Sequence, residues 1–138
     1  MFSKSTNTFV QENHHGVLTT FRRSGAAQMS LILCAAYDDG VAFTTPGDRA
    51  KLRNLRRDPR CTLVVSQDDW WGYVVLEGRA KIMEADNTDA DKLRDTLREV
   101  YGRISGEHPD WDEYDRIMIE ERRAVVVVVP EHVYGPQA

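Results

Sequence analysis

Five valines stand in a row at positions 125–129, near the end of the chain. Successive side chains of a strand point to opposite faces, so an unbroken β-branched run suits a strand that is buried on both of them. The closing segment "AVVVVVPEHVYG" therefore predicts a buried strand that ends at Pro130, which has no N–H to donate to a neighbouring strand.

Five other segments have strand character. They are rich in β-branched and aliphatic residues and cover residues 16–23, 27–37, 41–46, 61–67 and 73–84. The hairpin signals "SGA" and "DDG" separate the first three, which predicts an antiparallel meander. The turn "DDWWG" joins the last two, and Gly78 predicts a bulge within the last strand.

Three segments favour helices. Good helix formers lie between Asp48, a candidate N-cap, and Pro59, which stops a helix. A longer helix is predicted behind Thr88-x-x-Asp91, which resembles a capping box, and "PDWDEYDRIMIEERR" predicts another. Six strands with these helices predict one mainly β, α+β domain over residues 1–138, a small antiparallel barrel flanked by helices.

The composition argues against several classes of function. The 138 residues include 18 Lys and Arg against 22 Asp and Glu, giving a net charge of −4, whereas general nucleic-acid binders are basic throughout. We see no run of signal-peptide or membrane-spanning length, so a cytoplasmic protein is expected. Cys34 and Cys61 lie in apolar strand contexts and are expected to be buried thiols. The chain has no triad, Walker or zinc motif, so neither a metal site nor a catalytic residue is predicted.

One stretch departs from the acidic balance. Residues 44–60 hold six of the 18 Lys and Arg. A strand ending at Thr44 and Thr45, a Pro-Gly turn and a helix starting near Arg49 would bring together hydroxyls, free N–H groups and the positive end of a helix dipole. Lys51 could reach the same anion. The pattern favours a phosphate site; a solvated basic helix is the alternative, and DNA binding is weaker still.

Two adjacent tryptophans, Trp70 and Trp71, lie in the turn "DDWWGY". They suit either a packed lid over the core or an exposed contact for a flat ligand or a partner subunit. Core or dimer packing is the favoured interpretation. A flat ligand would connect this turn with the phosphate site.

Several motifs in order resemble one known family. "RAKLRNLRRDPR", "DDWWGYVVLEGRAKI", "GEHPDWDEYDRIMIEERR" and "PEHVYG" look like the pyridoxamine 5'-phosphate oxidase-like flavoproteins, and most like their actinobacterial subgroup that uses the deazaflavin coenzyme F420. The resemblance covers nearly all of residues 14–135. It implies a six-stranded antiparallel split β-barrel of the FMN-binding type. It also implies a homodimer with cofactor sites at the subunit interface.

The resemblance also implies where a cofactor would bind. Its phosphate would lie at the strand-turn-helix segment, its ring along the second strand, and aromatic residues of the second subunit would complete the pocket. The family's second strand often carries a Pro or Asn where this chain has Leu31 and Ile32. This difference affects the expected hydrogen bonds to the edge of the cofactor ring and not those to its phosphate. The expected cofactor-binding residues are Gln28, Met29, Ser30, Thr44, Thr45, Arg49, Lys51, Arg53, Asn54, Trp71 and Tyr73.

F420 is expected in preference to FMN. Beyond the phosphate site, Arg53, Arg56, Arg57 and Arg60 exceed what one phosphate needs and suit the acidic tail of F420. The expected function is an F420-dependent reductase that transfers a hydride to an unsaturated organic acceptor, with the proton from solvent or Tyr73. The alternatives are an FMN-binding oxidoreductase, a cofactor carrier without turnover, and a nucleic-acid module using the arginine helix.

Overall fold

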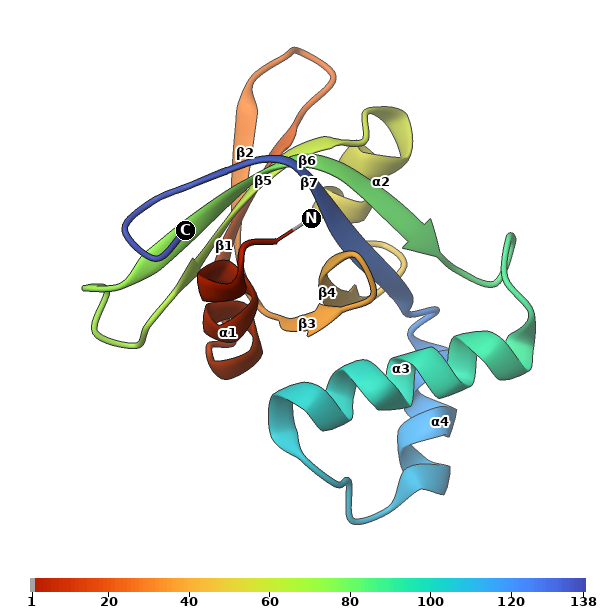
Figure 1. Ribbon diagram of the computed structural model, residues 1–138. Helices are drawn as coiled ribbons and strands as arrows, with labels where there is room; N and C mark the ends of the chain where they lie inside the picture. The colour runs from red at the N-terminus through yellow and green to blue at the C-terminus, as the bar shows by residue number, and fades with distance from the viewer. Residues whose placement is uncertain (1) are drawn as a thin grey trace.

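One curled antiparallel sheet organises the molecule, a computed structural model that describes residues 2–138 (Figure 1). The strands are β1 (His15–Phe21), β2 (Ala27–Leu33), β3 (Ala35–Tyr37), β4 (Gly40–Thr45), β5 (Arg60–Ser66), β6 (Tyr73–Met83) and β7 (Ala124–Tyr134). They lie in the order β2-β1-β5-β6-β7-β4-β3. The helices are α1 (Lys4–Glu12), α2 (Ala50–Arg57), α3 (Ala90–Ser105) and α4 (Trp111–Glu120). The predicted mainly β split barrel with flanking helices is confirmed.

The described sheet has seven strands rather than six, because the predicted strand 27–37 divides at Cys34. Its two parts, β2 and β3, lie at opposite edges of the sheet order. A single residue joins the two edges because the sheet curls, and the Cys34 N–H donates to the His14 carbonyl at 2.8 Å. Both hairpins of the predicted meander form, β1 with β2 and β3 with β4. The three strands are not one continuous meander, because β4 pairs with β7 on its other side and not with β2.

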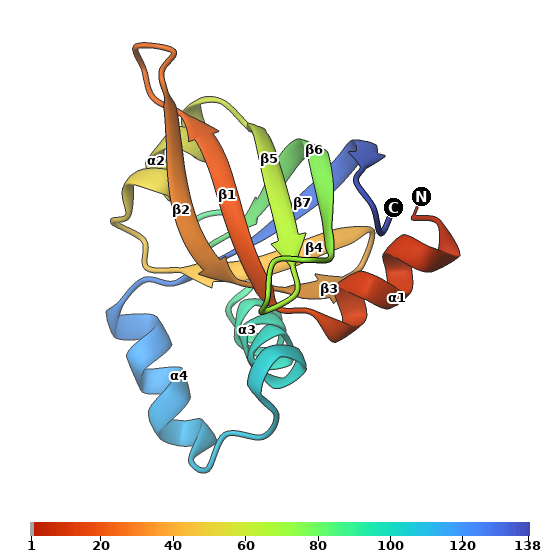
Figure 2. The same ribbon diagram turned by 90° about the vertical axis from the view of Figure 1, so that its left-hand side faces the viewer.

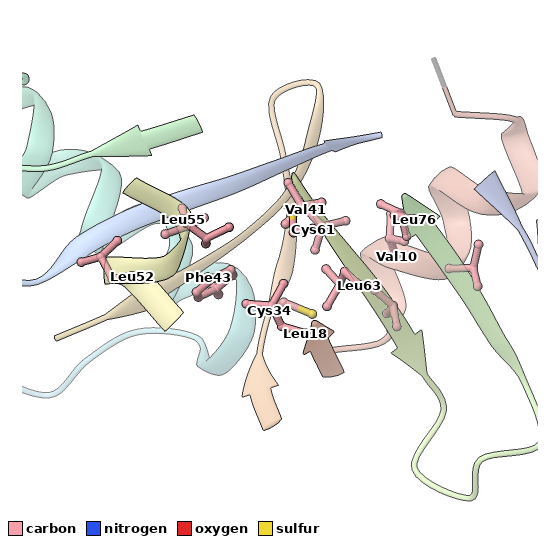
Figure 3. Packing of buried hydrophobic residues seen from close by; sticks show 14 of the residues in the cluster. Val10, Leu18, Cys34, Val41, Phe43, Leu52, Leu55, Cys61, Leu63 and Leu76 are labelled. Carbon is pink, nitrogen blue, oxygen red and sulfur yellow. The ribbon is translucent and has the colours of Figure 1, made fainter. Parts of the chain in front are cut away.

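The valine run is buried on both faces, as predicted. Val126 and Val128 face the barrel interior, where the core around Leu18, Phe43 and Leu63 lies (Figure 3). Val125 and Val127 face the other way and pack into a second cluster with residues of α3 and α4. The strand thus lies between the barrel core and the side chains of α3 and α4, which lie together below the sheet in Figure 2.

Pro130 does not end this strand, contrary to the prediction. β7 continues to Tyr134, and its register against β6 shifts by one residue between Glu77 and Gly78. Gly78 lies opposite Pro130, so the proline sits at a bulge, where a missing N–H is tolerated. A bulge does lie beside Gly78, as predicted, but the extra residue, Glu131, is in β7 rather than in β6. Its position explains how β7 extends beyond the proline.

α3 and α4 form where helices were predicted. The N-cap of α3 lies one residue later than expected. The Asp89 side chain, not Thr88, accepts the Lys92 N–H at 3.2 Å. α1 was not predicted; it buries Phe9 and Val10 in the barrel core and contacts β3. None of the helices described in residues 2–138 is long and apolar enough to cross a membrane.

Candidate anion-binding cleft

The start of α2 leaves backbone N–H groups without a side-chain acceptor. β4 ends at Thr45, a turn follows, and the helix begins at Ala50 with Arg49 in the N-cap position. Asp48, predicted as the N-cap, is not; its carboxylate lies 3.3 Å from the Arg49 guanidinium. Arg49 makes no capping hydrogen bond of its own. This helix end can therefore take an external anion.

Three cations gather beside this helix end. Lys51 has no hydrogen bond or ion pair within residues 2–138, and its pKa is lowered by burial, then by Arg49 and Arg123. The Arg123 Nη1 donates to the Thr44 hydroxyl at 3.0 Å, while its Nε donates to the Glu121 carboxylate at 2.8 Å. Lys51 is therefore held in a positive environment without a counter-charge of its own. Such an environment favours a bound anion.

These residues line one end of a cleft of about 570 Å³. The rest of its lining is mostly apolar or aromatic and comes from the end of β2 and from α3, α4 and the segment between them. This lining includes Leu31, Leu33, Tyr101, His108, Tyr114 and Met118. An apolar cleft with a few convergent polar groups at one end is the usual form of a small-molecule site.

Of the predicted site residues, Thr44, Arg49 and Lys51 line this cleft together. Thr45 points the other way, because alternate residues of a strand face opposite sides. It is fully buried, and its hydroxyl donates to the Pro46 carbonyl at 3.3 Å. The phosphate hypothesis thus rests on Thr44 and not on its neighbour.

Gln28 and Asn54 contact each other instead of the cleft. The Asn54 amide donates to the Gln28 side chain at 3.1 Å and to the Thr20 hydroxyl at 3.1 Å. This buried amide ties α2 to β1 and β2. Met29 is exposed on the outer face of β2, and Ser30 is half-buried outside the cleft lining. A ring-binding role for this strand therefore stays a prediction.

The aromatic residues at the β5–β6 turn lie on the surface. Trp71 is 83% exposed, and Trp70 and Tyr73 are also exposed. None of the three lines the cleft within this chain. The core-lid interpretation is wrong, and the exposed contact for a ligand or partner subunit remains.

Two of the remaining arginines are already neutralised. Arg56 pairs with Glu84 at 2.6 Å, and Arg60 pairs with Asp58 at 2.7 Å. The hydrogen bond from Arg60 lowers the pKa of Asp58 to about 2. Each guanidinium pairs with a carboxylate, as Arg49 does with Asp48 and Arg123 with Glu121. Of the three cations that line the cleft, Lys51 is therefore the one without a carboxylate partner among residues 2–138.

Arg53 and Arg57 bond to uncharged groups and keep their charge. Arg53 donates to the Asp48 carbonyl at 2.7 Å, and Arg57 donates to the Phe21 carbonyl at 2.6 Å. Neither lines the cleft. They contribute positive potential around the helix rather than a contact inside the cleft.

Sequence reasoning missed Arg123 and the aromatic wall of the cleft. Arg123 precedes β7, and the pairing of Thr45 with Ala124 brings it beside the end of β4. Nothing in the local sequence reveals that pairing. Tyr101, His108 and Tyr114 come from two helices and their connection, and their convergence also depends on tertiary packing.

The cysteines have the environment that was expected. Both Cys34 and Cys61 are free and buried. Burial raises the pKa of each thiol to about 12. Protonated, enclosed thiols are structural rather than nucleophilic.

The family model for pyridoxamine 5'-phosphate oxidase matches residues 2–135. A conserved hypothetical protein from Mycobacterium tuberculosis has a similar structure, with a TM-score of 0.77 and 24% identity over 98% of this chain and 84% of its own. An F420 reductase has a TM-score of 0.70 and 20% identity, over 93% and 94%. The heme storage protein HutZ from Vibrio cholerae has a TM-score of 0.70 and 16% identity, over 94% and 91%. At these identities the structures share the fold, and the match of the family model across the chain shows that it belongs to the pyridoxamine 5'-phosphate oxidase family.

Proposed function

We propose that this protein is an oxidoreductase that binds coenzyme F420 and uses it to reduce an unsaturated organic acceptor. Membership of an oxidoreductase and flavin-binding family supports the reaction class. The observation that carries the proposal is Lys51, which has no carboxylate partner among residues 2–138 and lines the same end of a largely apolar cleft as Arg49 and Arg123. A phosphorylated ligand with a flat ring matches the charged end of the cleft and the adjoining apolar wall formed by the end of β2.

The residues present fit such a cofactor. Arg49, Lys51 and Arg123, with the Thr44 hydroxyl and the first N–H groups of α2, would hold its phosphate. When bound, the reduced deazaflavin supplies the hydride, so the protein needs no nucleophile of its own. The cleft walls would orient the ring and exclude water. Solvent remains the proposed source of the proton.

F420 is the preferred cofactor, although fewer arginines are free to bind its acidic tail than the sequence suggested. Of the four arginines expected to meet an acidic tail, Arg53 and Arg57 keep unneutralised charge, whereas Arg56 and Arg60 pair with carboxylates. One of the similar structures is an F420 reductase. FMN remains the second candidate, because the three cations of the cleft are sufficient for its single phosphate.

A homodimer is the proposed assembly. An apolar row crosses the outer face of five strands, since residues paired directly across strands share a face. Its members are Leu31, Val17, Val64, Val75 and Tyr134. Leu31 is 81% exposed and also lines the cleft. A second copy covering this row would border the cleft and could bring its own Trp71 and Tyr73 to it.

Ligand titration followed by tryptophan fluorescence tests the proposal. We expect micromolar binding of F420, weaker binding of FMN, and much weaker binding of riboflavin, which lacks the phosphate. Failure of both F420 and FMN to bind would contradict the proposed function, and tight binding of FMN alone would select the second candidate. Multiple turnovers of reduced F420 with a conjugated ketone would then separate an enzyme from a carrier.

A further inference from the structure

An aromatic wall faces the cleft from the side of α3 and α4. Tyr101, His108 and Tyr114 all line it. The His108 ring lies 5.2 Å from Tyr101 and 5.3 Å from Tyr114, centroid to centroid, and those two tyrosine rings are 5.1 Å apart. Packing against two aromatic rings restricts the orientation of the imidazole.

The hydrogen bonds of this wall occupy the Tyr114 hydroxyl and leave the Nε2–H of His108 and the Tyr101 hydroxyl as donors for a ligand within residues 2–138. The His108 Nδ1 accepts the Asp110 N–H at 2.9 Å, so the neutral imidazole carries its proton on Nε2. The Tyr114 hydroxyl donates to the Leu97 carbonyl at 2.9 Å, and burial raises its pKa to about 12. In residues 2–138, the Nε2–H of His108 has no hydrogen-bond partner. His108 therefore has a free donor where Tyr114 has none.

The wall carries no formal charge. Arg49, Lys51 and Arg123 supply the charged side chains of the lining, and they lie at the α2 end of the cleft. The α3 and α4 side is formed by aromatic, aliphatic and thioether groups, with Met118 among them, and by the hydroxyl of Ser105. An anionic or cationic group would lose hydration here without a counter-charge. An uncharged planar molecule suits this surface.

We propose that this wall binds the acceptor, and that the His108 Nε2–H donates a hydrogen bond to a carbonyl oxygen of a planar, uncharged molecule. The inference rests on the proposed function, because it assigns the acceptor to the part of the cleft that the cofactor's phosphate does not need. His108 then selects acceptors with an oxygen at one position and orients them in the cleft.

Two substitutions test the roles of the two ring nitrogens of His108 separately. His108→Asn keeps an acceptor for the Asp110 N–H and removes the donor at the Nε2 position. His108→Gln places an amide donor near Nε2 and gives up the Nδ1 acceptor. Chromone, a bicyclic conjugated ketone, is the probe, and 2H-chromene, the same bicycle without the carbonyl, is the control ligand.

We expect His108→Asn to weaken chromone binding about 3- to 10-fold, which is the range for one net hydrogen bond. His108→Gln should bind chromone within about 2-fold of the unmodified protein, because it restores a donor. 2H-chromene should bind all three proteins alike. An equal loss for both ligands would show that only packing changed, and an unchanged chromone affinity in His108→Asn would also overturn the proposal.

Nitrogen NMR of the unmodified protein provides a test that does not depend on any variant folding. The His108 ring should be the Nε2–H tautomer, and its Nε2 resonance should shift with chromone and not with 2H-chromene. An Nδ1–H tautomer would overturn the proposal. Titration of the same proteins with F420 and FMN distinguishes the cofactor hypothesis from the His108 hypothesis. If chromone binding depends on His108 but neither cofactor binds, only the proposed function is contradicted.

Discussion

At the residue scale, Lys51 shows how a residue that binds a ligand can lower the stability of the ligand-free protein. It is half-buried, it lies near Arg49 and Arg123, and its pKa is lowered below the ordinary 10.5. Between the two pKa values the unfolded chain binds more protons than the folded one, so stability rises with pH in that window. At neutral pH the charged Lys51 therefore opposes folding until an anion binds.

Lys51→Met should consequently stabilise the empty protein and weaken cofactor binding. We expect the free energy of unfolding at pH 7 to rise by roughly 0.5 kcal/mol, a modest value because the side chain is partly solvated. The affinity for F420 should fall about 10- to 100-fold through loss of a charge-assisted hydrogen bond. Urea unfolding at pH 7 and at pH 10 checks the first effect, and the difference should be smaller at pH 10.

Lys92→Met is the matched control for this substitution. Lys92 is an exposed lysine of α3 and does not line the cleft. Its replacement should leave both stability and F420 affinity unchanged. A loss of affinity in both variants would mean that overall charge, rather than the position of Lys51, governs binding.

At the element scale, the pairing of β6 with β7 depends on a close approach at the bulge. A Cβ added to Gly78 would lie 2.0 Å from the Val129 carbonyl oxygen and 2.9 Å from the Pro130 Cα. Backbone atoms cannot give way as a flexible side chain does. A glycine is therefore required where β6 crosses the bulged part of β7.

Gly78→Ala should destabilise the protein by about 3 kcal/mol, because the added methyl forces the two strands apart. Gly102→Ala is the control: an added Cβ there, on helix α3, meets nothing within 4 Å. That change should stabilise the protein by about 0.5 to 1 kcal/mol, since alanine favours a helix over glycine. Urea denaturation measures both, and equal stabilities for Gly78→Ala and the unmodified protein would contradict the bulge argument.

The local elements were predictable to different degrees. α3 and α4 follow from helical periodicity, although the N-cap of α3 is Asp89 and not the predicted Thr88, and the irregularity at Gly78 follows from a glycine inside a strand pattern. The division at Cys34 does not follow from local sequence, because the residues on both sides favour strand. It results from the curvature of the sheet, which places β2 and β3 at opposite edges.

At the scale of the whole molecule, the outer face of the sheet is the proposed dimer interface. Leu31 is the most exposed member of its apolar row. We expect the protein to be a dimer at micromolar concentration and Leu31→Glu to be monomeric, because a carboxylate would be buried without a partner. Sedimentation equilibrium gives the mass in each case.

Ile119→Glu is the control for the interface. Ile119 is 78% exposed on α4 and lies outside the apolar row. This variant should remain a dimer. Dissociation of both variants, or of neither, would place the interface elsewhere, and a monomeric unmodified protein would remove the dimer from the proposal.

The sequence alone determined the strand-rich architecture, the buried valine strand and the Thr44, Arg49 and Lys51 group. These features depend on side-chain alternation, helix periodicity and one short segment, all of which are local. Only the tertiary structure decided that Arg123 joins that group, that Arg56 and Arg60 are neutralised, and that His108 faces the same cleft. Those relations join residues from separate elements, and the curled sheet and the packing of α3 and α4 bring them together.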